Sequence, residues 1–119
     1  MQNPDKKKKG RYFEKLACEY LIKKGYSLLD QNFSTPYGEL DLIFKDGDIL
    51  VIVEVKGRKK SKAFDIKRSI GREKVKRILK TTEIYITKKK IEFREIRLDA
   101  VFIEKIGKDF EISHFVNWI

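Results

Sequence analysis

The feature that most limits the fold of this chain is an apolar run that ends in charged residues. Residues 49–53 read Ile-Leu-Val-Ile-Val, and Glu54, Val55 and Lys56 follow directly. A continuous aliphatic run of this length is typical of a strand that is buried on both faces of a sheet. Because other elements must cover such a strand, the chain is expected to form a mixed α/β domain with helices flanking a central sheet.

The other expected elements follow from periodicity and turn signals. Apolar residues at helical spacing predict helices over residues 10–24 and 69–88. An Asp-Gly turn at 46–47 predicts a hairpin, and a loop is expected at 34–38. The predicted strands cover residues 26–33, 39–44, 49–56, 96–104 and 110–115. The chain therefore reads as one domain over residues 10–119, preceded by a basic, flexible end at 1–9.

The charge balance indicates the class of partner. The 119 residues include 28 Lys and Arg against 18 Asp and Glu, a net charge of +10. This excess favours a polyanion, most commonly nucleic acid, although a basic surface that serves only solubility is the alternative. Cys18 is the single cysteine and no apolar segment approaches the ~20 residues of a membrane span. A cytoplasmic protein without a membrane partner is expected.

Acidic residues occur on two neighbouring strands where charge is costly. Glu39 and Asp41 are expected to share one face of the second strand, opposite Leu40 and Leu42. If the Asp-Gly hairpin pairs the second and third strands, Asp41 and Glu54 come close together. Two carboxylates 4 Å apart repel by about 4 kcal/mol at an effective dielectric constant near 20. A positive group is therefore expected between them.

Lys56 is one source of that positive charge, since it shares a face with Glu54. A divalent ion is a better one, and oxygen ligands suit Mg²⁺ or Mn²⁺; zinc is disfavoured because His114 is the only histidine. Such an ion would activate a water and shield a phosphate, while Lys56 orients the water. On the residues alone, an exposed salt bridge at the end of the strand is the alternative.

At these residues the chain resembles a known family. Glu14 and the segments 38–43 (GELDLI) and 53–58 (VEVKGR) are similar to the YraN family of small bacterial proteins. That family looks like a branch of the restriction-endonuclease-like (PD-(D/E)XK) nucleases, close to the archaeal Holliday junction resolvases. The resemblance runs from residue 10 to about 103 and implies an α-β-β-β-α-β(-β) order. Leu40 stands where those nucleases usually have proline.

The resemblance also implies roles for individual residues. Asp41 and Glu54 would hold Mg²⁺ or Mn²⁺, Lys56 would be catalytic, and Glu14 would support the metal directly or through water. Glu39 is a weaker candidate for an outer ligand. The implied activity is that of a metal-dependent endonuclease on DNA, more than RNA, including branched or structured DNA. The alternative is a nucleic-acid-binding adaptor that keeps the nuclease fold but does not cut.

Basic residues near this cluster are the candidates for nucleic-acid binding: Arg58, Lys59, Lys60, Lys62 and Lys74. Such side chains contact phosphates and supply affinity without sequence information, and solvated positions are the alternative. Asp99 is expected to pair with Arg97 or a group at a helix end, and His114 is expected at the surface. Trp118 would cap the core or mark a dimer contact, and a two-fold dimer would suit a junction substrate.

Overall fold

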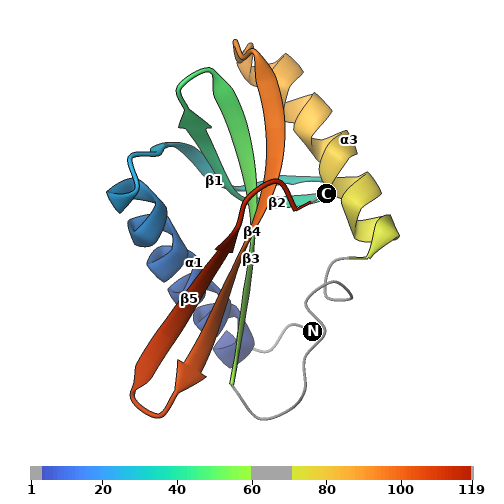
Figure 1. The fold of residues 1–119 in the computed structure, drawn as a ribbon. Helices are drawn as coiled ribbons and strands as arrows, with labels where there is room; N and C mark the ends of the chain where they lie inside the picture. The colour runs from blue at the N-terminus through green and yellow to red at the C-terminus, as the bar shows by residue number, and fades with distance from the viewer. Residues whose placement is uncertain (1–3, 60–70, 119) are drawn as a thin grey trace.

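The computed structural model describes residues 4–59 and 71–118, and it describes side chains within residues 10–57 and 71–118. Along these ranges the elements are α1 (Pro4–Lys23), β1 (Ser27–Thr35), β2 (Gly38–Asp46), β3 (Ile49–Lys59), α3 (Arg72–Lys89), β4 (Glu95–Ile106) and β5 (Asp109–Phe115). The predicted fold class and the order helix, three strands, helix, two strands are confirmed (Figure 1).

The strands form one mixed sheet in the order β1-β2-β3-β4-β5. β3 and β4 are parallel, and each has an antiparallel neighbour on its other side. In the central strand β3, the four residues 50–53 are at most 1% exposed. The prediction of a strand buried on both faces is therefore confirmed.

One helix covers each face of the sheet, with α1 on one side and α3 on the other (Figure 1). The cluster on the α1 side includes Ala17, Leu21, Val51 and Val53. The cluster on the α3 side includes Leu50, Ile52, Ile78 and Tyr85. Burial of such a side chain contributes roughly 1.5–3 kcal/mol for the larger residues, so these two clusters hold the helices against the sheet.

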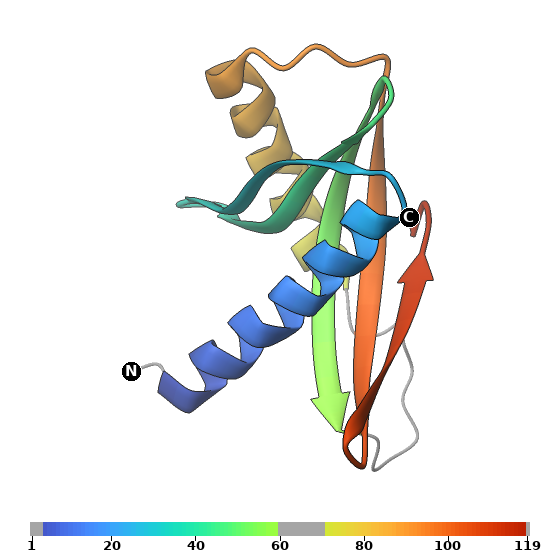
Figure 2. The same cartoon turned by 90° about the vertical axis from the view of Figure 1, so that its left-hand side faces the viewer.

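β2 twists sharply near Asp41. Its ladder with β3 runs from Asp46↔Ile49 to Leu42↔Val53. Leu42 packs in the α1-side cluster, but Leu40, two residues earlier, packs in the α3-side cluster. Figure 2 shows the β1–β2 hairpin turning away from β3 and β4. The expectation that Leu40 and Leu42 share a face is wrong, because a strongly twisted strand does not keep the simple alternation of a straight one.

The helices differ from their predicted limits. α1 begins at Pro4, so residues 6–9 of the expected flexible end are helical. α3 begins at Arg72, and residues 69 and 70 of the predicted helix lie outside the described residues. Neither helix is long and apolar enough to cross a membrane, a statement that covers residues 4–59 and 71–118.

The turn after β1 and the end of β3 differ from their predicted limits. The loop at 34–38 is a tight turn with only Pro36 and Tyr37 between β1 and β2. β3 continues to Lys59 because it pairs with β4 along its whole length, so Arg58 and Lys59 belong to a strand and not to a loop.

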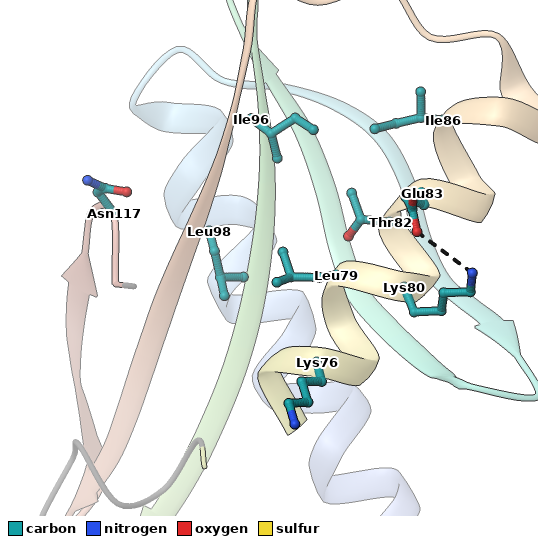
Figure 3. Close-up of a pocket in the computed structure, with 9 residues that line it drawn as sticks. All are labelled: Lys76, Leu79, Lys80, Thr82, Glu83, Ile86, Ile96, Leu98 and Asn117. Atoms are coloured by element: carbon teal, nitrogen blue, oxygen red, sulfur yellow. Dashed lines mark ion pairs between the residues drawn. The ribbon is translucent and has the colours of Figure 1, made fainter. Parts of the chain in front are cut away.

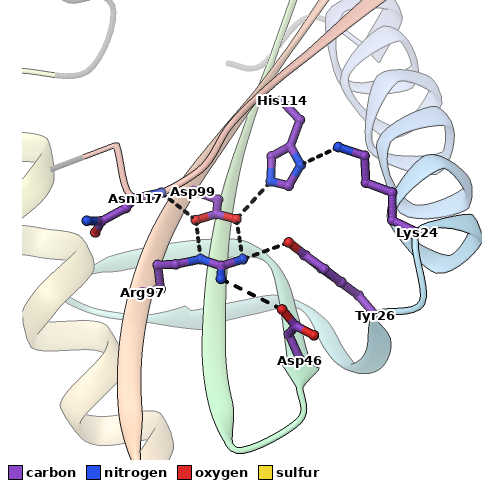
Figure 4. A network of polar contacts seen from close by, with 7 residues as sticks. All are labelled: Lys24, Tyr26, Asp46, Arg97, Asp99, His114 and Asn117. Carbon is purple, nitrogen blue, oxygen red and sulfur yellow. Dashed lines mark hydrogen bonds and ion pairs between the residues drawn. The ribbon is translucent and has the colours of Figure 1, made fainter.

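A buried ionic cluster ties the end of the chain to the sheet (Figure 4). Asp99 on β4 is fully buried and accepts hydrogen bonds of 2.9 Å from Arg97 Nε and from the backbone N–H of Asn117. Its Oδ2 lies 2.8 Å from His114 Nε2 on β5. Burial acts to raise the pKa of Asp99, but the bonds from His114, Arg97 and Asn117 outweigh it and lower that pKa. The expected pairing of Asp99 with Arg97 is observed.

The cluster reaches the connection between α1 and β1 through two further contacts. Arg97 donates to the hydroxyl of Tyr26 at 2.7 Å, and Lys24 Nζ lies 3.0 Å from His114 Nδ1. The side chain of His114 is only 1% exposed, so the expectation that it lies at the surface is wrong. The partners of His114 are Asp99 on β4 and Lys24 just after α1, and no local sequence pattern predicts these contacts.

Candidate active site

Asp41 and Glu54 meet where the β2–β3 ladder ends. The register that pairs Leu42 with Val53 places Asp41 opposite Glu54 if it is continued by one step. Asp41 Oδ2 accepts a hydrogen bond of 2.9 Å from the backbone N–H of Val55, so a side chain takes up a donor at the point where the two strands separate. The structure therefore brings the two acids of neighbouring strands to one point.

Glu54 carries its charge in an almost fully buried position. Its side chain is 1% exposed, and its Oε2 lies 3.1 Å from the Nζ of Lys74 on α3. Burial, followed by the charge of Asp41, raises the pKa of Glu54 to about 7, against the opposing effect of Lys74 and Lys56. Burial likewise raises the pKa of Asp41, although the Val55 N–H and both lysines oppose it. The pair thus holds a proton more readily than ordinary surface carboxylates.

Two lysines compensate this pair of acids. Burial lowers the pKa of Lys56, and so do a hydrogen bond with Lys74 and the positive charge of Lys74. Burial also acts to lower the pKa of Lys74, but the charge of Glu54 and hydrogen bonds to Glu54 and Lys56 raise it overall. The two amines therefore divide their roles: Lys74 stays the ammonium partner of Glu54, and Lys56 is the one that gives up a proton more easily.

Glu14 approaches the same point from α1. Burial, then the charge of Asp41, raises the pKa of Glu14 to about 7, and a hydrogen bond with the Asn32 side chain opposes this rise. The helix comes this close because Gly57 has no side chain: a Cβ at that position would lie 2.1 Å from the Phe13 ring. A glycine on β3 therefore sets the position of Glu14, the residue after Phe13.

Asn32 is a member of this site that the sequence pattern does not single out. It lies within β1 but has a φ of 53°, in the left-handed region that asparagine tolerates better than most residues. A neighbouring register shift between Leu28 and Asp30 shows that β1 is irregular here. An asparagine inside a strand pattern is the only signal in the sequence, and it does not indicate contact with Glu14.

The acids suit a hard divalent cation in their chemistry. Oε1 of Glu14 and Oε1 of Glu54 are buried without a hydrogen-bond partner among the described residues. Such oxygens lack the compensation that burial requires, and Mg²⁺ or Mn²⁺ would supply it. As the side chains lie, residues 10–57 and 71–118 contain no group of three or more His, Cys, Asp or Glu arranged to hold a metal. The ammonium of Lys74 instead provides positive charge at Glu54.

The remaining candidates are distributed as follows. Lys74 is part of the site through Glu54, whereas Glu39 is exposed and acts on Glu14 through its charge. Arg58 and Lys59 extend β3 beyond the site. Lys60 and Lys62 lie outside the described residues.

A separate hollow of about 580 Å³ lies between α3 and β4 (Figure 3). Its walls are largely apolar, from Leu79, Ile86, Ile96 and Leu98, and Lys76 and Lys80 also line it. None of the carboxylates Glu14, Asp41 and Glu54 lines it. This hollow therefore does not belong to the candidate active site.

The strand order and the flanking helices define a restriction-endonuclease-like α/β domain. The model of the uncharacterised protein family UPF0102 matches residues 13–103 of the chain. The chain belongs to this family, also called the YraN family, so the resemblance seen in the sequence is confirmed.

Relatives from several bacteria match nearly the whole chain. The UPF0102 protein of Clostridium botulinum (strain Alaska E43 / Type E3) is 40% identical over 107 residues, which are 88% of each chain. That of Vibrio campbellii is 38% identical over 116 residues, covering 96% of this chain and 90% of its own. UPF0102 protein THEYE_A1950 of Thermodesulfovibrio yellowstonii is 40% identical over 108 residues, covering 91% and 92%.

Proposed function

We propose that this protein is a metal-dependent endonuclease that hydrolyses phosphodiester bonds of DNA, with Asp41, Glu54 and Lys56 at its active site. The observation that carries the proposal is the meeting of Asp41 and Glu54, both with raised pKa values, beside Lys56 and Lys74. Perturbed carboxylates and amines gathered at one point are characteristic of functional sites.

Each residue of the cluster has a role that its surroundings support. Asp41 and Glu54 would hold Mg²⁺ or Mn²⁺, with Glu14 as a further ligand directly or through water. The bound ion would lower the pKa of a water and shield the phosphate. Lys56, whose pKa is lowered, would orient the attacking water and accept its proton when neutral. Lys74 would move from Glu54 to a phosphate oxygen, since it is 40% exposed.

The charge of α3 supports a nucleic-acid substrate. Residues 72–90 contain eight Lys or Arg and two Glu, a large part of the net charge of +10. Because this helix also supplies Lys74, its positive charge extends to one side of the candidate active site. A field of this sign draws the phosphate backbone toward the carboxylates, which would otherwise repel it.

Cleavage assays on linear, nicked and four-way DNA, with Mg²⁺, Mn²⁺ or EDTA, test the proposal. We expect cutting in the presence of either metal, none in EDTA, and a loss of at least a hundredfold in Asp41→Asn and Glu54→Gln with DNA binding retained. Asp109→Asn and Glu111→Gln are matched controls, because both residues are exposed on β5, and these variants should cut normally. Cutting that survives in both active-site variants would rule the assignment out.

An adaptor that binds nucleic acid without cutting is the second candidate. The Lys74–Glu54 ion pair favours it, because this pair supplies positive charge at Glu54 without a metal. Salt-sensitive DNA binding with no cleavage under any metal would select the adaptor. An absence of binding even at low salt would leave an interaction module whose charge serves solubility.

A further inference from the structure

The tip of the β1–β2 hairpin is fixed to α3. Thr35 Oγ1 accepts a hydrogen bond of 3.1 Å from the backbone N–H of Tyr37, and it lies 3.3 Å from Thr81 Oγ1 on the helix. A Cβ at Gly38 would lie 3.3 Å from the Cβ of Arg77, so glycine permits this close approach of strand and helix. The two-residue turn is therefore held in one place, and it does not hang free from the sheet.

This fixed turn presents an exposed aromatic ring with a cation over one face, which leaves the other face open to a base. Tyr37 is 54% exposed, and the Nζ of Lys80 lies 5.6 Å from the centre of its ring. Proteins that bind single-stranded nucleic acid combine the same two elements, an aromatic face on which a base stacks and a basic groove that follows the phosphates. We call Tyr37, Arg77 and Lys80 the hairpin-tip platform.

The hairpin-tip platform is continuous with the candidate active site. Lys74, Arg77 and Lys80 recur at three-residue intervals on α3, so they are neighbours on the helix surface. About 9 Å along the helix axis separates Lys74 from Lys80. β2 runs alongside this part of α3. Its residue Gly38 lies beside Arg77, and the charge of Lys74 acts to lower the pKa of Asp41 three residues later. If the nucleotides before the platform keep the ~3.4 Å spacing of a duplex strand, this distance corresponds to roughly three nucleotides.

We propose that the hairpin-tip platform stacks an unpaired base about three nucleotides from the phosphate held at Asp41 and Glu54. The place of that phosphate rests on the proposed function. Bases inside a duplex are stacked on each other and offer no free face to Tyr37, so the platform selects DNA that is single-stranded at this point. Flaps, forks and the open centre of a branched junction provide such a segment, and an uninterrupted duplex does not.

Fluorescence anisotropy in EDTA tests the platform on a single-stranded oligonucleotide, a flap and a blunt duplex. Tyr37→Ala should weaken binding to the first two by about tenfold and leave duplex binding unchanged, because one base loses its stacking partner. Tyr37→Phe keeps the ring and should bind like the wild type. Tyr12→Ala is the control, since Tyr12 is 49% exposed on α1 and packs near Phe13 and Phe110. Equal affinities of Tyr37→Ala and wild type for all three DNAs, or equal losses on all three, would overturn the proposal.

A base analogue separates the platform from the nuclease. A 2-aminopurine placed three nucleotides from the cleaved phosphate should be quenched by the wild type in EDTA and not by Tyr37→Ala. If this quenching occurs but no metal supports cutting, the nuclease proposal fails and the platform stands. If Asp41→Asn abolishes cutting while Tyr37→Ala quenches, binds and cuts as the wild type does, the platform fails and the nuclease stands.

Discussion

At the scale of single residues, the energetics of the candidate site are dominated by the burial of Glu54. A carboxylate that is 1% exposed, faces Asp41 and has one oxygen without a hydrogen-bond donor favours its protonated form. The folded state therefore binds a proton that the unfolded chain has released between pH 4.5 and about 7. Ionisation of Glu54 in this pH range opposes folding, so the buried charge of Glu54 lowers the free energy of unfolding.

The stability of the metal-free protein should consequently fall as the pH rises from about 4.5 to about 7. In Glu54→Gln this fall should shrink by up to about 3 kcal/mol, since one pKa unit corresponds to ~1.4 kcal/mol. Urea unfolding in EDTA at several pH values measures it. Glu111→Gln, exposed on β5, should keep the wild-type slope. Identical pH profiles for Glu54→Gln and the wild type would contradict the raised pKa of Glu54.

At the scale of elements, the docking of α1 depends on a glycine in β3. The Phe13 ring occupies the space that a side chain at position 57 would need. Gly57→Ala should therefore displace the helix and cost about 1–3 kcal/mol, as overpacking does, and should reduce cleavage because Glu14 follows Phe13. Urea unfolding and the cleavage assay measure the two effects.

Gly10→Ala is the matched control for the docking of α1. Gly10 lies in the same helix with nothing within 4 Å of an added Cβ. Alanine there should be neutral or stabilise the helix by up to about 1 kcal/mol. A Gly57→Ala protein as stable as Gly10→Ala would show that Phe13 moves aside without disturbing the helix.

The elements also show which kinds of sequence signal predict structure. Asp-Gly at 46–47 identified the β2–β3 hairpin, and the charges at Asp41 and Glu54 were recognisable because they interrupt apolar strands. The sequence predicts a loop at 34–38 and not a two-residue turn, because the tightness of this turn depends on contacts with α3. The sequence does not predict that Lys74 lies against Glu54, because this contact depends on how α3 is rotated about its axis when it packs on the sheet. The sequence does not indicate Asn32, because its hydrogen bond with Glu14 depends on the left-handed backbone conformation of this residue.

At the scale of the whole molecule, the cluster around Asp99 joins the last strand to the connection between α1 and β1. Through Arg97, His114 and Asn117 it links β4 to the last strand and the residues after it, and through Tyr26 and Lys24 it reaches the end of α1. Asp99 has a lowered pKa, so it contributes stability above pH ~4 that is lost as the pH falls further.

Removal of Asp99 should destabilise the entire domain. Asp99→Ala leaves Arg97 and His114 without their buried partner, and breaking such a pair typically costs about 3–5 kcal/mol. Thermal unfolding followed by near-ultraviolet circular dichroism measures the loss. Asp109→Ala, at an exposed position that begins β5, should change stability by less than about 0.5 kcal/mol. Equal melting temperatures for the two variants would show that the network contributes nothing.

The β2–β3 hairpin carries Asp41, Glu54 and Lys56, but Glu14 and Lys74 come from α1 and α3, so the hairpin alone holds an incomplete centre. Glu14 and Lys74 approach the acids from opposite layers, so both helices must pack on the sheet to complete the centre. Any chemistry at this point is consequently an all-or-none property of the folded domain. In a denaturant titration, the proposed DNA cleavage and the tertiary structure should disappear together, at one midpoint.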